Sequence, residues 1–200
     1  MNSQNGNMPH IFVLSAPSGG GKNTVIKRLI DRDSDIQYVI SATTRLPRRD
    51  EMNGCNYHFL SEAEFQDKIK ADDFLEWAHV YGSYYGTLRS EVNKVFDAGK
   101  NVVMDVDIQG ALALKEKVVS NGILIFLLPP SLRVLEKRLK ERGTDSSEEI
   151  AKRLQKARKE IEFADQYDFQ IINEDLDKTV NELLAIVQAF KALKKEELVV

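Results

Sequence analysis

The stretch that most constrains this chain is a glycine-rich segment, residues 15–24, with the sequence SAPSGGGKNT. An apolar run at residues 11–14 precedes it, and an amphipathic run at residues 25–30 follows it. This order predicts a strand, a glycine loop and a helix. Glycines let successive backbone N–H groups turn toward one anion, and the positive end of the helix dipole adds to the attraction. The segment is therefore predicted to bind phosphate.

The segment departs in two places from the usual phosphate-binding pattern, which is Gly, four residues, Gly-Lys-Ser/Thr, with the lysine on the β- and γ-phosphates and the hydroxyl on Mg²⁺. Ala16 stands at the first glycine position, which is tolerable if its backbone has an ordinary φ. Asn23 stands at the hydroxyl position. Its amide oxygen can ligate Mg²⁺ directly or through water, and Thr24 offers a hydroxyl one residue later. The alternative is that the glycines form only a flexible turn, which would leave the position of Lys22 unexplained.

Composition narrows the class of protein. Of the 200 residues, 42% are hydrophobic and 30% are charged, and the net charge is −3, so the chain is an ordinary globular protein and nucleic acid is not an expected partner. Cys55 is the only cysteine, which excludes an internal disulfide and fits a reducing compartment. Residues 1–9 have no secretory pattern, and no apolar run is long enough for a membrane span. We expect a cytoplasmic protein with a disordered segment at residues 1–9 and no membrane partner.

Much of the remaining chain alternates apolar strands with helices. Strands are expected at residues 38–41, 101–105, 122–127 and 169–173. Helices are expected at residues 90–98, which stop at Gly99, at residues 108–119 and from residue 176 to about residue 190. Continuous apolar strands separated by helices indicate a parallel sheet that is covered on both faces. The fold class is therefore α/β.

Two segments differ from this alternation. Residues 46–90 contain short aromatic stretches around one helix, residues 62–71, which starts with the Ser-x-x-Glu spacing of a capping box at Ser61, and we interpret them as an inserted subdomain. Further on, Ser131 is expected to cap a basic helix at residues 132–142, and Ser146 a second charged helix that runs to about residue 164. Gly143 separates these two helices, which suggests a mobile flap.

A phosphate loop, an aspartate at a strand end (Asp105), an arginine-rich flap and an insertion together indicate phosphoryl transfer between two bound molecules. Such transfer needs positioning and charge neutralisation more than covalent chemistry, and a closing lid keeps water from taking the phosphoryl group. The sequence resembles that of guanylate kinases, in the nucleoside monophosphate kinase family with the P-loop fold, from residue 11 to the last helix. The matching stretches are residues 15–24, 41–48, 54–59, 74–78, 84–87, 105–110, 129–131 and 138–144.

The resemblance implies transfer of the γ-phosphate of ATP to GMP, and to dGMP, giving ADP and GDP with Mg²⁺ as cofactor. It implies a P-loop NTPase-like five-stranded parallel sheet with helices on both faces, an inserted mixed α+β subdomain that binds the monophosphate, and a helical lid. The expected division is a core at residues 10–40, 91–136 and 165–200, a GMP-binding insertion at about 41–90 and a lid at about 137–164. The expected assembly is a monomer or a homodimer.

The resemblance also assigns residues to roles. The residues that it places at ATP are Ala16, Pro17, Ser18, Gly19, Gly20, Gly21, Lys22, Asn23, Thr24, Arg138 and Asn173. Those that it places at GMP are Ser41, Arg45, Arg48, Tyr57, Glu76, Tyr85, Thr87 and Asp107. Those that it makes catalytic, by stabilising charge on the transferring group, are Lys22, Arg45, Arg142 and Arg153. Asn23 and Asp105 are the candidate Mg²⁺ ligands.

Selectivity for guanine is assigned by the resemblance to Glu76, whose carboxylate matches the group that accepts the N1–H and the exocyclic amine of the base. Adenine has no matching pair of donors, so AMP would leave a buried carboxylate unsatisfied. Two alternatives stay open. One is a guanylate-kinase-like module that binds peptides in the cleft without catalysis, for which Asn23 is the one favourable feature. The other is a kinase for a different acceptor.

Overall fold

The computed structural model describes residues 9–80, 82–117, 121–141, 143 and 146–192. The expected disorder of residues 1–9 therefore falls, apart from Pro9, outside the described residues. The same holds for Arg142 and for the expected last two residues of the helix at 108–119.

A five-stranded sheet forms the centre of the molecule. Its strands, given in chain order, are β1 (Ile11–Ser15), β2 (Ile36–Tyr38), β7 (Asn101–Asp105), β8 (Gly122–Leu128) and β9 (Phe169–Ile172). The spatial order is β2-β7-β1-β8-β9, and every pairing is parallel. The α/β fold with a five-stranded parallel sheet is thus confirmed. In an open parallel sheet, ligands collect beyond the carboxyl ends of the strands, where neighbouring strands connect in opposite directions.

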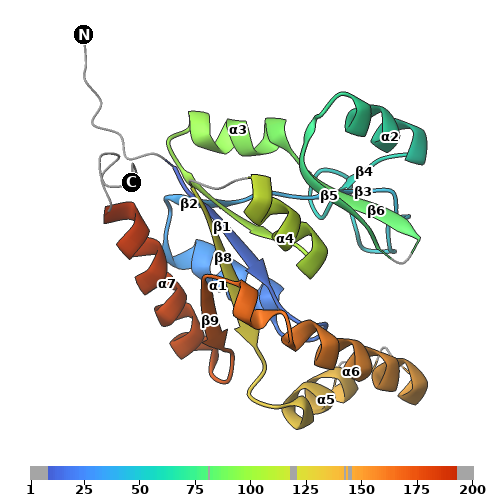
Figure 1. The fold of residues 1–200 in the computed structure, drawn as a ribbon, viewed down its shortest axis with the longest axis vertical. Coiled ribbons are helices and arrows are strands. Elements are labelled where there is room, and N and C mark those ends of the chain that lie inside the picture. The colour runs from blue at the N-terminus through green and yellow to red at the C-terminus, as the bar shows by residue number, and fades with distance from the viewer. Residues whose placement is uncertain (1–8, 81, 118–120, 142, 144–145, 193–200) are drawn as a thin grey trace.

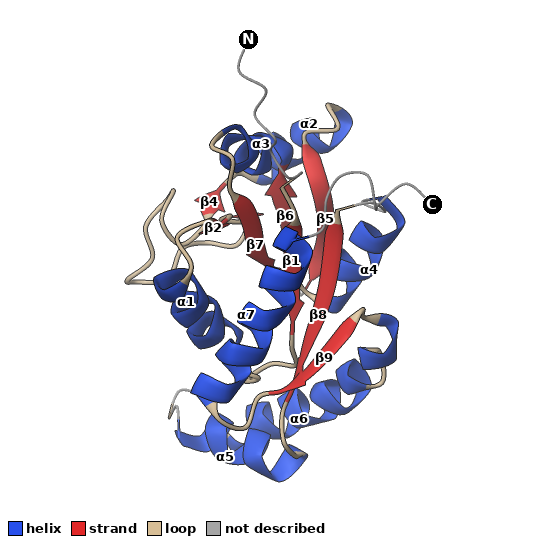
Figure 2. Ribbon diagram, turned by 90° about the vertical axis from the view of Figure 1, so that its left-hand side faces the viewer, coloured by secondary structure: helices blue, strands red, loops and turns tan. Residues whose placement is uncertain are grey.

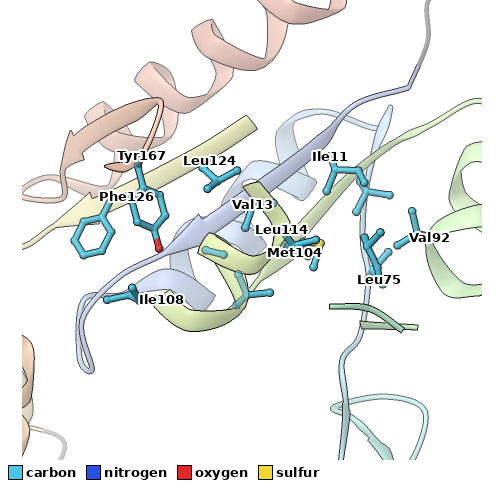
Figure 3. Packing of buried hydrophobic residues seen from close by; sticks show 14 of the residues in the cluster. Ile11, Val13, Leu75, Val92, Met104, Ile108, Leu114, Leu124, Phe126 and Tyr167 are labelled. Carbon is cyan, nitrogen blue, oxygen red and sulfur yellow. The ribbon is translucent and has the colours of Figure 1, made fainter. Parts of the chain in front are cut away.

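Helices cover both faces of this sheet, as the buried strands predict. The face that carries Phe12 and Leu14 packs against α1 (Lys22–Arg32) and α7 (Leu176–Ala192), and α7 lies in front of the sheet in Figure 2. The opposite face packs against α3 (Arg89–Asp97) and α4 (Ile108–Lys117). Figure 3 shows this second cluster, where Val13, Met104 and Leu114 meet in the core. Burying each such side chain contributes about 1.5–3 kcal/mol.

A second, mixed sheet occupies the segment that we interpreted as an insertion. Its strands are β3 (Ala42–Thr43), β4 (His58–Phe59), β5 (Phe74–Val80) and β6 (Ser83–Leu88), in the spatial order β4-β3-β6-β5. One helix, α2 (Glu62–Lys70), begins at the predicted capping box and packs on this sheet through Phe65, whose ring stacks on Phe74 at 4.2 Å. Figure 1 shows this sheet and α2 on the opposite side of α4 from α5 and α6.

Helices α5 (Leu132–Glu141) and α6 (Ser147–Ile161) pack against each other through a small apolar cluster of Leu135, Leu139, Ile150 and Ala157. Both predicted N-terminal caps are confirmed. The Val134 N–H donates to Ser131 Oγ, and Ser146 forms a full capping box with Glu149. The rest of the chain adds a 3₁₀ turn, η1 (Ala164–Gln166), before β9.

Two element boundaries differ from prediction. The strand expected at residues 38–41 is β2 (Ile36–Tyr38), because the chain crosses between the two sheets just after it. Val39 still donates to the Val103 carbonyl in the central sheet, whereas the Ser41 carbonyl already accepts from His58 in the second. The charged helix α6 ends at Ile161, not near residue 164, because the following residues form the 3₁₀ turn.

Within the part of the chain that the structure describes, no helix has the length and apolar character needed to cross a bilayer. The side chain of Cys55 is exposed.

The buried side chain of His10 gives a testable pH dependence. It is 2% exposed and lies against the rings of Phe12 and Phe190, and this burial lowers its pKa below the usual 6.5. Below pH 6.5, the unfolded chain therefore binds a proton at His10 more readily than the folded chain does. The free energy of unfolding thus decreases as the pH falls below 6.5, the pKa of histidine in the unfolded chain. We expect the melting temperature to fall more steeply between pH 7.5 and 5.5 in the wild type than in His10→Leu. Parallel melting curves across that range would contradict this role of His10.

Candidate functional site

The loop after β1 has a backbone that requires its three glycines. Gly19 and Gly21 both have φ of 89°, a left-handed conformation that side chains disfavour. A Cβ added at Gly20 would lie 2.8 Å from Ala16 Cβ and 2.9 Å from the Pro17 carbonyl oxygen. Ala16 does not have a positive φ, so alanine can stand at this position in place of the usual glycine. This loop has a defined shape, which argues against a merely flexible turn.

Asn173, the residue that follows β9, holds the backbone of the glycine loop. Asn173, which is 6% exposed, donates its amide to the Gly20 carbonyl at 2.7 Å, and the Thr179 hydroxyl donates to its Oδ1. Arg138 on α5 donates to the Asn173 carbonyl at 2.8 Å. Both residues, expected at ATP, line a hollow beside the loop. The remaining residues of that hollow are Gly19, Gly21, Thr24, Glu141, Glu174 and Leu176.

Lys22, the first residue of α1, points toward the end of β7. Its Nζ lies 3.4 Å from the Val106 carbonyl oxygen and 3.9 Å from Asp105 Oδ2. The other oxygen of Asp105 accepts a hydrogen bond from the Tyr38 hydroxyl. Burial and the neighbouring Asp105 charge raise the pKa of Tyr38, so its hydroxyl stays protonated as the donor. Asp105 is thereby held between a phenol and an ammonium group.

The two candidate metal ligands come together. Asn23 and Asp105 line one hollow, which also contains Tyr38 and the GMP-assigned residues Arg45, Arg48, Tyr57 and Tyr85. No cluster of three or more His, Cys, Asp or Glu side chains that could hold a metal occurs among the described residues. Mg²⁺ prefers oxygen ligands, keeps several waters and needs only one or two carboxylates from the protein. The donor set at this position fits such an ion.

A pair of oppositely charged side chains, Arg45 and Glu51, also lines this hollow. The two terminal nitrogens of Arg45 each donate to Glu51 at 2.9 Å, and the Arg48 N–H donates to Glu51 Oε2 at 2.8 Å. These hydrogen bonds raise the pKa of Arg45 and lower that of Glu51. The Arg45 guanidinium also lies over the Tyr57 ring, 5.4 Å from its centroid. The Arg45 guanidinium is therefore charged and held in one orientation.

The two tyrosines assigned to GMP pack edge to face, with ring centroids 6.2 Å apart. Burial raises the pKa of Tyr57, which keeps its hydroxyl protonated. A protonated phenol beside two arginines is a hydrogen-bond donor to an anion, so this part of the hollow is suited to a phosphate.

A buried carboxylate faces the adjoining hollow. Glu76 on β5 is 4% exposed, and its Oε1 accepts from the hydroxyl of the fully buried Thr87 at 2.8 Å. Ser41 and Asp107 line the same hollow as Glu76, together with Lys22. Asp107 Oδ1 accepts the Gly110 N–H at 2.8 Å at the start of α4. Glu76 and Asp107 thus bring carboxylate acceptors to the wall of one hollow, as recognition of a donor-rich base edge requires.

The charged helix α6 lies beside the glycine loop, where the Ser18 N–H donates to Glu160 Oε2 at 3.4 Å. Arg153 lines a hollow with Ser18, Arg48, Glu149, Lys152 and Lys156. The lysines were not among the predicted site residues. Arg142, predicted to be catalytic, lies outside the described residues.

Comparisons with known proteins identify the family. A family model described as guanylate kinase matches residues 8–190. The chain belongs to the guanylate kinase family. Proteins named guanylate kinase from Clostridium perfringens strain 13 and Caldanaerobacter subterraneus subsp. tengcongensis are 46% and 48% identical to it over 181 residues, which cover 90% of this chain and 83% and 87% of theirs. The crystal structure of guanylate kinase from Anaplasma phagocytophilum matches with a TM-score of 0.76 and 30% identity, covering 94% of this chain and 88% of that one.

In this guanylate kinase family member, sequence reasoning also missed two residues that position the predicted site residues. Tyr38 ends β2 and holds Asp105, and Glu51 holds Arg45. Tyr38 lies within a run that we interpreted as a plain strand, and Glu51 lies six residues after Arg45 in a loop without periodicity. A polar side chain at a strand end was the only signal for Tyr38. Nothing in the local pattern marked Glu51.

Proposed function

We propose that this chain is a phosphotransferase that moves the γ-phosphate of ATP to GMP, giving ADP and GDP, and that it accepts dGMP as well. Family membership supports the activity. The observation that carries the substrate assignment is that Lys22 of the glycine loop and the buried Glu76 line the same hollow. A phosphate-binding lysine and a base-reading carboxylate can therefore act on two molecules held in one cleft.

For ATP, we propose that the backbone N–H groups of residue 16 and residues 18–24 hold the phosphates together with the Lys22 side chain, while Pro17 shapes the loop and Arg138 and Asn173 border the nucleoside. Asn173 acts mainly through the loop, because its amide is already bonded to the Gly20 carbonyl. Asn23 and Asp105 would hold Mg²⁺, directly or through water. When bound, that ion would neutralise charge on the phosphates and orient them.

For GMP, we propose that Arg45, Arg48, Tyr57 and Tyr85 hold the phosphate and that Glu76 reads the base. Glu51 and the Leu46 carbonyl already fix the orientation of the Arg45 guanidinium, so little conformational freedom is lost when its remaining N–H groups bind phosphate. Thr87 fixes one oxygen of Glu76, and Ser41 and Asp107 supply further polar contacts beside it.

Transfer itself needs positive charge around the moving phosphoryl group. We propose that Lys22, Arg45, Arg142 and Arg153 supply it, and that residues of about 137–164, which include the second half of α5 and all of α6, form a lid that excludes water. The insertion at about residues 41–90 carries GMP, and the core comprises residues 10–40, 91–136 and 165–200. We further propose that the enzyme serves purine nucleotide metabolism in the cytoplasm, as a monomer or a homodimer, without nucleic acid or membrane partners.

The test is a coupled ADP-release assay with ATP and Mg²⁺, in which GMP, dGMP, AMP, UMP and CMP are offered in turn. We expect turnover with GMP and dGMP and at most background with the others. Protein that binds GMP but releases no ADP would favour the non-catalytic binding module. Turnover of another monophosphate with GMP left untouched would overturn the substrate assignment.

The unusual Asn23 gives a separate prediction. Asn23 is exposed and lines the same hollow as Asp105, where an amide oxygen can take the place of a hydroxyl as a Mg²⁺ ligand. Asn23→Ser restores the common hydroxyl, so we expect it to preserve or raise ADP release when Mg²⁺ is limiting. Titration of Mg²⁺ at fixed ATP would measure this, with Thr24→Val as a companion variant. A collapse of activity in Asn23→Ser would show that Asn23 has another role.

A further inference from the structure

Gly110 lies on the first turn of α4, directly against the carboxylate of Glu76. A Cβ added to Gly110 would lie 2.6 Å from Glu76 Oε2 and 3.3 Å from Asp107 Oδ1. Real Cβ atoms essentially never come within 3.0 Å of another heavy atom in this way, so the Glu76 carboxylate would have to move. The present position of that carboxylate is therefore available only because residue 110 has no side chain.

Glu76 has little freedom to give way. Its other oxygen, Oε1, is bonded to the Thr87 hydroxyl at 2.8 Å, and the residue is 4% exposed. Its backbone is held by the pairing of β5 with β6, next to an irregularity in the register between Phe74 and Glu76. A displaced carboxylate would either break the bond to Thr87 or enter the hollow where the base is proposed to lie.

The backbone of Gly110 does not itself require glycine. It is not among the glycines with positive φ, and it lies inside a helix, where alanine is favoured over glycine. A helix of this kind would be more stable with alanine at residue 110. The close approach of Glu76 is therefore the feature that accounts for a glycine here.

We propose that Gly110 is a positioning residue that sets the location of the Glu76 carboxylate and thereby determines how tightly the guanine of GMP is bound. This inference rests on the proposed function, because it takes Glu76 as the group that reads the base. A shift of the carboxylate by about 1 Å misaligns both of its hydrogen bonds to the base, and a misplacement of that size can cost about 100-fold. The ATP side of the site would be untouched.

The test compares Gly110→Ala with the wild type and with Gln109→Ala, a control at the neighbouring exposed position of the same helix. We expect Gly110→Ala to lower kcat/KM for GMP about 100-fold, mainly by raising the KM for GMP. The KM for ATP should stay the same, and the melting temperature should stay the same or rise. Gln109→Ala should match the wild type. GMP kinetics unchanged in Gly110→Ala would overturn the proposal, and so would a loss accompanied by weaker ATP binding and a lower melting temperature, since Gly110 would then serve general packing.

A second measurement isolates the contact with Glu76. Glu76→Asp shortens the side chain by one methylene and withdraws the carboxylate from Gly110. We expect Gly110→Ala to weaken GMP binding, measured by calorimetry, about 100-fold alone but less than about threefold when added to Glu76→Asp. Equal losses in both backgrounds would contradict the proposal. A wild-type protein that neither binds nor phosphorylates GMP would instead refute the proposed function, so the two failures are distinguishable.

Discussion

Replacement of Glu76 by glutamine is expected to lower kcat/KM for GMP by about 10²- to 10³-fold and to narrow the preference for GMP over AMP. The carboxylate presents only acceptors to the N1–H and the amine of guanine, whereas an amide presents one acceptor and one donor. Because residue 76 is only 4% exposed, water cannot reach the amide N–H of glutamine and the base N–H that it would face, so both donors would lack an acceptor. Each lost hydrogen bond to a charged group costs about 1.5–3 kcal/mol. Adenine, with one acceptor and one donor on its edge, suits the amide better than the carboxylate.

The measurement is kcat/KM for GMP and AMP in the same coupled assay, with a thermal melt to show that Glu76→Gln folds. Glu62→Gln, an exposed acid on α2 in the same segment, is the matched control and should keep both constants. If Glu76→Gln retains the selectivity of the wild type, Glu76 does not read the base.

Lys22→Met is expected to lower kcat by about 10³-fold while GMP binding changes less than about threefold. Methionine keeps much of the length of the side chain and removes its charge, so the loss reports the electrostatic stabilisation of the transferring phosphoryl group, for which single groups contribute about 10²–10³-fold. The wild-type ammonium lies 3.9 Å from Asp105, so its removal also leaves that carboxylate with one fewer cation.

Single-turnover ADP release and calorimetric titration with GMP separate these two effects. Lys94→Met, an exposed lysine on α3, removes the same charge at a position that lines none of the hollows described above and should behave as the wild type. A variant of Lys22 with normal kcat and weakened GMP binding would place this lysine at the acceptor, not at ATP.

Much of the fold followed from local patterns. The apolar run before the glycine loop, the apolar run at residues 122–127 and the capping serines Ser61 and Ser146 all gave elements close to those observed, because a strand or a helix start depends mainly on residues within one or two turns. The boundary of β2 did not follow, since it depends on where the chain leaves one sheet for another. That crossing is set by partners about 20 and 60 residues away in the sequence, His58 and Val103.

The candidate site divides in the same way. The sequence by itself determined the glycine loop, the lysine that ends it and the chemical types of the residues that gather around it. Only the tertiary structure decided that Glu51 grips Arg45, that Tyr38 holds Asp105 and that the bare backbone of Gly110 makes room for Glu76. Tyr38 and Asp105 are 67 positions apart in the sequence, and Gly110 and Glu76 are 34 positions apart. The geometry of both contacts arises from how α4 and the two sheets pack together, and no local periodicity in the sequence indicates that packing.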